Sequence, residues 1–421
     1  MLLLLGLMVG ASQEGEPDAS ELFRAGASAP RTQALEPGYR VNASRPKYID
    51  RLGVSDLALG ANDALHAALR DDGGDAWAVR AIKYGLSFWF GVACSHVVHE
   101  YGHMCSLSRA GFNEAMLGPV GASGDQKDEA TLPRLFAQGM WPSEGRALSL
   151  KDEDWAELQR RFEGRPADFN RFWLTVEAGG LNQEQVFVSR YARRLREDRL
   201  SFLDTPVVLW GAAGTLMYSA TIEESDIADY LERLSVEGRE SSASELKALS
   251  ALRFLGGTGL ASLRGGVQGL FGSGGGAVEP FSTELGDGVR VFWPEVESYL
   301  TRCGPTLKLD LPVCPGGWTL LPSYERAFAS GGEDHEGGLR VRAPFFDSIL
   351  WLEAAFYVSD QGGQWRSAEA ELRPLAWLSL LVGTEGGRGY TFRRDVYGSR
   401  DSYLDGSERS LLLGLRLSWA F

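Results

Sequence analysis

The spacing of apolar residues changes once along the chain. From residue 54 to 272, apolar positions recur every three or four residues, which is typical of amphipathic helices. From residue 284 onward, apolar and polar residues alternate, which is typical of strands with one apolar face. The pattern therefore predicts an α+β protein, in which a helical domain (54–272) and a glycine-rich linker (273–283) precede an antiparallel β domain (284–421).

The helical part contains two segments that are uncharged and almost wholly apolar, residues 84–98 and 205–221. Each is slightly shorter than the ~18 residues at which a membrane-spanning helix becomes the first interpretation. We therefore expect helices buried in the core of a large helical domain. Helices inserted in a membrane, or lying against one, are the alternative.

The alternation is most regular at the end of the chain. Odd positions from Leu411 to Leu417 are leucine, Trp419 and Phe421 follow, and even positions from 414 on are small or charged. One face is thus compatible with lipid, as in a membrane strand of ~9–11 residues. This ending resembles that of bacterial outer-membrane β-barrel proteins, many of which finish on an aromatic residue. The resemblance implies a small barrel of about eight strands, with a soluble sandwich or half-barrel as the alternative.

The start of the chain and its charge bear on the compartment and on the partners. Residues 1–12 combine an apolar run with small residues, which predicts a secretory signal segment. Residues 13–53 show no clear periodicity, so we expect an extended or mobile lead-in. The net charge is 42 − 56 = −14, which disfavours nucleic acid as a partner because the field of the protein repels phosphates.

Export would permit a disulfide bond. Cys303 and Cys314 flank two short extended runs around a bend, which can bring them together. Disulfides form and persist in oxidising compartments. We therefore expect a Cys303–Cys314 disulfide.

Three of the five histidines lie within eight positions, in the stretch SHVVHEYGHMCSL at residues 95–107. His99 and His103 are four residues apart, so on a helix their rings project from the same face. Two imidazole nitrogens can then reach one Zn²⁺ at ~2.0–2.1 Å each. Glu100 would overhang the open coordination position, where it can take a proton from water and return it to a leaving amine. The stretch thus predicts a hydrolytic zinc site, with incidental histidines on a helix as the alternative.

The sequence HEYGH resembles the zinc-binding helix of zincin-type metallopeptidases. The resemblance implies that His99 and His103 are zinc ligands and that Glu100 is the catalytic base. His96 belongs to the same stripe, but it lies about 10.5 Å from His103 along a helix at ~1.5 Å per residue, too far to share one ion. We expect His96 to support the site without binding the metal.

Catalytic zinc normally has three protein ligands and a water, so a third ligand must come from elsewhere. We expect Glu184, with Glu177 as the alternative. Asn182 is a good helix cap, which would place Glu184 in the first turn of a new helix. Gly179 and Gly180 would allow a close backbone approach. A glutamate on a helix downstream of the histidines is the arrangement of one large zincin subgroup, whereas an ordinary helix-terminal acid is the alternative for both residues.

The residues around His103 also resemble a second group of metallopeptidases. The preceding glycine, and the small and apolar residues that follow, look like the site-2 protease type of membrane metalloprotease. Such enzymes usually supply an aspartate ligand from an Asn-x-x-Pro…Asp-Gly motif. The Asp-Gly pairs here begin at Asp287 and Asp405, and both lack the upstream Asn and Pro at matching spacing. This resemblance therefore stays secondary to the general zincin type.

Together these features predict a zinc-dependent metallopeptidase of the bacterial cell envelope that acts on a protein or peptide substrate. We expect it at the outer membrane with periplasmic exposure, and in contact with the membrane. Two alternatives stay open. One is an outer-membrane barrel or anchoring protein with a structural or inactive zinc site, and the other is an intramembrane protease of the site-2 type.

Overall fold

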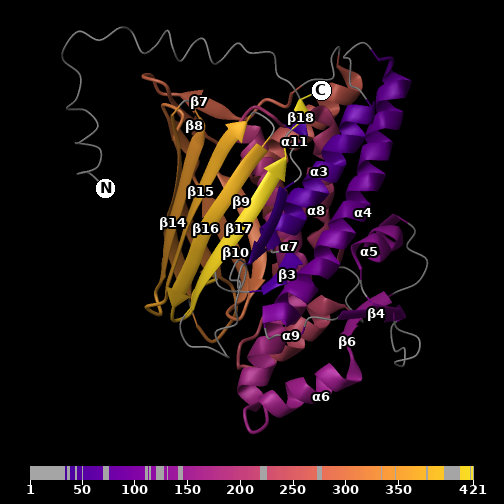
Figure 1. Ribbon diagram of the computed structural model, residues 1–421, viewed down its shortest axis with the longest axis vertical. Helices are drawn as coiled ribbons and strands as arrows, with labels where there is room; N and C mark the ends of the chain where they lie inside the picture. The colour runs from indigo at the N-terminus through magenta and orange to yellow at the C-terminus, as the bar shows by residue number, and fades with distance from the viewer. Residues whose placement is uncertain are drawn as a thin grey trace, which may run out of the picture. The chain divides into compact units, whose positions relative to one another are not determined.

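Helices come first along the chain and an antiparallel sheet follows (Figure 1). The computed structural model describes residues 34–35, 38–42, 45–49, 51–69, 75–109, 112, 115–119, 128–129, 131–140, 146–218, 225–272, 277–332, 334–346, 348–375, 378–392, 408–417 and 419–420. This order of elements confirms the predicted α+β class. The expected signal segment (1–12) lies outside the described residues, as does Phe421.

The described α-helices of the helical part range in length from 9 to 33 residues. Its α-helices are α3 (Arg51–Leu69), α4 (Trp77–Arg109), α5 (Leu132–Met140), α6 (Asp152–Arg161), α7 (Pro166–Arg196), α8 (Thr205–Tyr218), α9 (Asp226–Val236), α10 (Ala243–Leu252) and α11 (Gly257–Phe271). Two 3₁₀ helices, η2 (Phe202–Asp204) and η4 (Arg253–Leu255), complete it. A small sheet in the order β5-β4-β6 joins β4 (Ala115–Pro119), β5 (Asp128–Glu129) and β6 (Arg146–Leu150).

Helices α3, α4, α7 and α8 pack together around one apolar core (Figure 1). Val98 of α4, Phe187 of α7 and Val207 of α8 are fully buried there. Both apolar segments noted in the sequence thus contribute side chains to this core. Among the helices that the structure describes, none combines the length and the apolarity that crossing a membrane requires.

Helix α7 is longer than the sequence pattern predicts. We expected one helix to end at Gly179–Gly180 and another to begin at Asn182, but a single helix runs from Pro166 to Arg196. Asn182 is therefore not a cap. Its amide donates to the carbonyl of Leu300 and accepts from the Leu300 N–H, both at 2.7 Å, so it covers the backbone of an edge strand.

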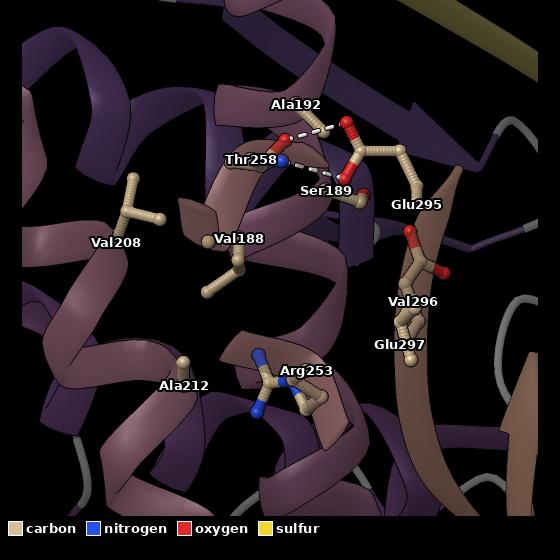
Figure 2. Close-up of a pocket in the computed structure, with 11 residues that line it drawn as sticks. Val188, Ser189, Ala192, Val208, Ala212, Arg253, Thr258, Glu295, Val296 and Glu297 are labelled. Atoms are coloured by element: carbon tan, nitrogen blue, oxygen red, sulfur yellow. Dashed lines mark hydrogen bonds between the residues drawn. The ribbon is translucent and has the colours of Figure 1, made fainter. Parts of the chain in front are cut away.

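Helix α11 lies within the predicted helical domain and ends just before the predicted glycine-rich linker, although its own sequence is also rich in glycine. Its N-terminus is covered by Glu295, which accepts hydrogen bonds from the N–H (3.0 Å) and hydroxyl (2.7 Å) of Thr258 (Figure 2). Such a carboxylate satisfies backbone N–H groups that lack helical partners and opposes the helix dipole. Glycines face neighbouring side chains closely, as Gly269 does Phe202. The glycines thus serve helix packing rather than chain flexibility.

The strands that follow α11, except the last, form one thirteen-stranded sheet together with β2 and β3 from before α3. Its main path runs β3-β2-β17-β16-β15-β14-β13-β12-β11-β8-β7, and β10 pairs with both β12 and β9. The strands are β2 (Gly38–Asn42), β3 (Arg45–Ile49), β7 (Ser282–Glu284), β8 (Val289–Phe292), β9 (Glu295–Thr301), β10 (Gly304–Asp310), β11 (Val313–Pro315), β12 (Thr319–Ala327), β13 (His335–Phe345), β14 (Leu350–Ser359), β15 (Gln364–Leu375), β16 (Leu378–Arg388) and β17 (Glu408–Leu417). In addition, β1 (Ala34–Leu35) pairs with β18 (Trp419–Ala420).

Two expectations about chain organisation need correction. The described strands form an open sheet, with β3 and β7 at the ends of its path, and not the closed barrel of about eight strands that we expected. Part of the expected lead-in (13–53) belongs to this sheet, because β2 pairs with β17. Helices and sheet fall within one compact unit, Ala34–Phe421. Of the expected linker (273–283), residues 273–276 lie outside the described part.

The large sheet turns its apolar face outward. In β14, Leu352, Phe356 and Val358 are exposed, whereas Tyr357 between them is buried. The pairing aligns such positions across strands, with Val382 opposite Leu413 and Leu380 opposite Leu415. The exposed side chains, here called the outer leucine face, are Leu339, Leu352, Phe356, Val358, Leu372, Leu380, Val382, Leu411, Leu413 and Leu415.

The opposite face of the sheet carries buried charges. Arg342 of β13 donates to Glu197, just after α7, at 2.6 Å. Its guanidinium also faces Glu371 of β15 at 3.5 Å. The contact with Glu197 joins this face of the sheet to the end of α7. The apolar side chains point to the opposite side of the sheet and are exposed. The polarity of a water-soluble sheet is thus reversed.

The expected disulfide does not form: Cys303 and Cys314 are not bonded to each other. Strand β10 runs extended between them, which separates the two residues by roughly 20 Å or more at ~3.3 Å per residue. Cys303 packs in a small core with Val186 and Tyr299, and the thiol of Cys314 contacts the hydroxyl of Thr319. Cys314 lies beyond the far end of β10, too far from Cys303 for the two sulfur atoms to bond.

Candidate metal centre

Helices α4 and α7 cross at glycines. A methyl group on Gly102, the residue before His103, would lie 2.2 Å from the carbonyl oxygen of Gly179. A methyl group on Gly179 would in turn lie 2.7 Å from the carbonyl oxygen of Gly102 and from the hydroxyl of Ser106. Glycine in a helix interior costs up to about 1 kcal/mol relative to alanine, but here it allows the two backbones to touch. The crossing therefore aligns the HEYGH turn of α4 with the middle of α7.

We expect Gly102→Ala to lower the free energy of unfolding by ~1–3 kcal/mol, because the added methyl group overpacks the crossing. Gly85 is the matched control, since it lies in the same helix and a methyl group there meets nothing within 4 Å. Gly85→Ala should raise stability by about 0.5–1 kcal/mol. Denaturant unfolding of both variants measures the difference, and equal effects of the two substitutions would contradict a close crossing.

Three side chains meet beside the crossing of α4 and α7. The Nε2 atoms of His99 and His103 are 3.3 Å apart, and each lies 3.1 Å from Oδ2 of Asp226. Asp226 is the first residue of α9, behind Ser225. Both histidine side chains are almost fully buried, whereas that of Asp226 is 28% exposed. The cluster is therefore enclosed except on the side of Asp226.

The partners of the two rings fix where their protons lie. His103 Nδ1 is 2.7 Å from the carbonyl oxygen of Val176, which can only accept, so Nδ1 donates. His99 Nδ1 faces Oε1 of Glu184 at 3.1 Å, where a carboxylate accepts in the same way. In the neutral rings, both Nε2 atoms then carry lone pairs. Two lone pairs and a carboxylate oxygen converge on one point, which is the arrangement of a cation site.

The dimensions of this triangle fit zinc. Four ligands at ~2.0–2.1 Å in a tetrahedron stand about 3.3–3.4 Å apart, close to the observed spacings of 3.1 and 3.3 Å. Gly180 of α7 keeps the point accessible, because a methyl group there would lie 2.5 Å from His103 Nε2 and 2.6 Å from His99 Nε2. Two imidazoles and one carboxylate, with a fourth position for water, form a usual catalytic zinc set.

The electrostatics of the cluster favour a cation. Burial opposes a charge on Asp226, but His103 and His99 hold the pKa of its carboxyl well below the usual range. Burial also opposes a charge on His103, but Asp226, and more weakly Glu100, raise the pKa of its imidazole. A metal ion competes with protons for these same atoms, so affinity for metal must fall as the pH decreases.

Glu100 and Glu177 are the further acids at the site. Glu100 follows His99 in α4 and is buried. Glu177 of α7 is also buried, and burial, together with the nearby charge of Asp226, raises the pKa of its carboxyl to about 7. Both carboxylates are thus near the charged cluster. With such a pKa, the carboxyl group of Glu177 is suited to exchange protons at neutral pH.

The residues that we expected at the site have different positions and contacts in the structure. Glu184 lies against Nδ1 of His99, on the far side of the ring from the triangle, so it orients this ring and does not join the three converging atoms. The third converging atom belongs to Asp226 and not to Glu184 or Glu177. His96 packs toward α5, where a methyl group on Gly139 would lie 3.1 Å from its Cβ, and its buried Nε2 has no hydrogen-bond partner among the residues that the structure describes.

Asp226 is the residue that the sequence pattern did not reveal. It belongs to the segment SDIADYLERLS, where an acid after a serine is an ordinary helix start. Asp287 does not take its place, because it lies in the turn between β7 and β8, where its φ is 49°. Asp405 lies outside the described residues. A weak signal was present, since an aspartate was the ligand that the site-2 protease resemblance called for.

No protein-family model, curated protein or solved structure matches this chain. Fold analogy therefore contributes nothing to the assignment of function. The assignment of function rests on the chemistry of the cluster of His99, His103 and Asp226.

Proposed function

We propose that the protein is a zinc-dependent metallopeptidase that hydrolyses peptide bonds with water. One observation carries the proposal: the Nε2 atoms of His99 and His103 and Oδ2 of Asp226 form a triangle with sides of 3.1–3.3 Å, directly beside Glu100 in the chain. The triangle has the dimensions of three zinc ligands, and Glu100 is the residue that the HEYGH resemblance implies as the general base.

Each residue has a role that follows from its contacts. When bound, zinc would polarise the scissile carbonyl and make water a better nucleophile at neutral pH. Glu100 accepts the proton of the attacking water and delivers it to the leaving amine. Glu184 and the Val176 carbonyl hold the two imidazoles in the tautomer that presents Nε2. The exposed side of Asp226 provides the way in for a protein or peptide substrate.

The direct test is cleavage by the purified, zinc-loaded protein. We expect it to degrade an unfolded protein such as casein, and we expect a chelator to stop this cleavage. A structural or inactive zinc site would instead give a fully loaded protein that cleaves no member of a peptide library. This outcome would favour an anchoring protein over a peptidase.

A second candidate, a protease of the site-2 type that acts within the membrane, is favoured by one observation. The third converging atom comes from an aspartate on a downstream helix, which is the ligand type that this resemblance implies. The two candidates differ in substrate. A site-2 type enzyme would cleave membrane-spanning peptides in detergent and leave soluble ones intact, whereas a zincin would cleave soluble peptides.

We also propose that the protein works at a membrane of the bacterial cell envelope, the outer membrane with periplasmic exposure. The outer leucine face supports this proposal, because contiguous apolar patches of this kind mark interaction or membrane surfaces. Its rows continue from strand to strand, as Leu372 pairs with Leu380 and Leu380 with Leu415. In this proposal the open sheet, with its charged face turned to α7, presents this apolar face to lipid.

We expect Val382→Arg to weaken binding to phospholipid vesicles, because Val382 lies within the outer leucine face and an arginine there meets hydrocarbon. The cost of a cation on a lipid-facing strand is ~2–4 kcal/mol at the midplane. Vesicle flotation measures the bound fraction. Glu163→Arg is the control, since Glu163 is exposed near the end of α6 and its replacement adds the same side chain. Equal flotation of the two variants would exclude lipid as the partner of this face.

A further inference from the structure

A second group of polar side chains is buried where α3 meets α4, α7 and η2. Asp63 and His66 come from α3, Asp204 from η2 and Arg194 from α7. One ligand atom from each of Asp63, His66 and Asp204 lies within 4.8 Å of the other two. His66 and Asp204 are 4% and 2% exposed, so solvent does not stabilise their charges. This group takes no part in the chemistry proposed above.

The hydrogen bonds of Ser87 determine which nitrogen of His66 carries a proton. The Ser87 hydroxyl lies 2.6 Å from the carbonyl oxygen of Leu203, which can only accept, so the hydroxyl donates to it. The same hydroxyl oxygen is 2.8 Å from Nε2 of His66 and must accept there. His66 therefore donates through Nε2. This tautomer is the reverse of that in a Ser-His-Asp triad, whose histidine accepts from the serine.

The other nitrogen of His66 then faces a carboxylate. His66 Nδ1 lies 3.5 Å from Oδ1 of Asp204. In the neutral ring this nitrogen carries a lone pair, so two acceptors point at each other. Burial lowers the pKa of His66, although Asp204 and Asp63 act in the opposite direction. A neutral ring leaves the contact between Nδ1 and Asp204 without a positive group.

The charges of the cluster do not balance by themselves. Arg194 pairs with both carboxylate oxygens of Asp63, and its nearest nitrogen stays 3.9 Å from Oδ1 of Asp204. Asp204 accepts instead from the Ser201 N–H at 2.8 Å and from the amide of Asn62 at 3.4 Å. One guanidinium thus accompanies two carboxylates. An uncompensated buried carboxylate costs several kcal/mol.

A separate observation points to a missing positive partner. Asn62 is fully buried, and its Oδ1 atom has no hydrogen-bond partner within the described residues. Its Nδ2 atom already donates to Asp204 and to the hydroxyl of Tyr191. A buried amide oxygen without a partner is uncommon, and amide oxygens are ligands of divalent cations.

We propose that a divalent cation, Mn²⁺ or Zn²⁺, binds between His66 Nδ1, the Asp204 carboxylate and the Asp63 carboxylate. An imidazole nitrogen with carboxylate oxygens is a ligand set that such ions accept. The cation separates the two facing acceptors and places positive charge against Asp204, from which the nearest nitrogen of Arg194 stays 3.9 Å away.

This second site is distinct from the proposed catalytic one. Ser87 and His99 are twelve residues apart on α4, which places them about 18 Å apart along the helix axis. The metals of two-metal hydrolases lie ~3.5–4 Å apart, so the two sites cannot act on one substrate atom. A cation here joins α3 to η2 and α7, and its effect is on stability.

The test uses the full-length protein with His99→Ala and His103→Ala, which removes the first site. After treatment with EDTA, this background variant is supplied with Mn²⁺ or Zn²⁺, and bound metal is counted by mass spectrometry after gel filtration. We expect about one equivalent, together with a rise in melting temperature on loading. Adding His66→Gln should abolish both. Adding Asp204→Asn, which preserves shape, should do the same.

His96→Gln is the matched control in that background, because His96 is a histidine of the same helical part that lies outside the cluster. We expect it to keep the bound equivalent and the rise in melting temperature. If the background variant binds neither ion, the proposal is wrong. It is equally wrong if the His66→Gln or Asp204→Asn variant retains the full equivalent. Neither result bears on peptidase activity, since the first site is absent throughout.

Discussion

In a Glu100→Gln variant, peptide hydrolysis falls by ~10²–10⁴-fold while zinc stays bound. Glutamine keeps the shape of the side chain, but it cannot accept the proton of the attacking water. The three converging atoms of His99, His103 and Asp226 are untouched, so the metal content should equal that of the wild type. Cleavage of a fluorogenic peptide library and mass-spectrometric metal analysis on the same preparation measure both quantities.

Glu163→Gln provides the matched control for this experiment. Glu163 is exposed near the end of α6, and it undergoes the same chemical change without contact with the site. We expect full activity in this variant. Wild-type activity in the Glu100→Gln protein would remove Glu100 from the mechanism. A loss of zinc in that protein would mean that Glu100 binds the metal.

The second large effect distinguishes the residue that binds the metal from the one that orients a ring. Replacing a residue that contacts a metal ligand, but not the metal, typically lowers metal affinity by ~10–100-fold. We expect Asp226→Ala to lower zinc affinity by more than this. Glu184→Ala should stay within that range, because its carboxylate contacts Nδ1 of His99 and not the converging atoms. Competition with a coloured chelator measures both dissociation constants.

The two variants are each other's control, because each removes one carboxylate that contacts His99. Circular dichroism checks that both proteins fold. If Glu184→Ala proves the more damaging substitution, Glu184 enters the coordination shell, as the sequence pattern predicted. Equal losses would mean that both carboxylates bind the ion.

The histidine pair could be predicted from the sequence because its geometry is local. Two residues four positions apart share a helix face whatever the rest of the chain does. Asp226 could not be predicted in this way, since it lies 123 residues after His103 and is brought in by the packing of α9. The three atoms are brought together only by the tertiary structure, so no short sequence motif predicts the complete ligand set.

The glycines of α7 show a second limit of sequence reasoning. Gly179 and Gly180 usually favour a break in a helix, and we expected one there. Their small size instead allows α4 to cross and leaves space in front of the histidine nitrogens. Local propensity was overridden by a contact with a helix about 75 residues earlier in the chain.

Alternation likewise defines two faces of a strand, but it does not say which one is buried. For β14 and β16 the sequence correctly predicts strands with an apolar face. The structure places that face outside, whereas the other face is joined to the end of α7 through the contact of Arg342 with Glu197. Closure of the sheet depends on the pairing of its first and last strands, which periodicity cannot specify.

The cluster beside the glycine crossing of α4 and α7 can form only late in the synthesis of the chain. During synthesis the histidine pair leaves the ribosome long before Asp226 does, since 123 residues separate His103 from that aspartate. Contacts over such distances form later than local helices. A nascent chain therefore carries the HEYGH turn without the triangle of atoms, which can form only after α9 has been translated and has packed.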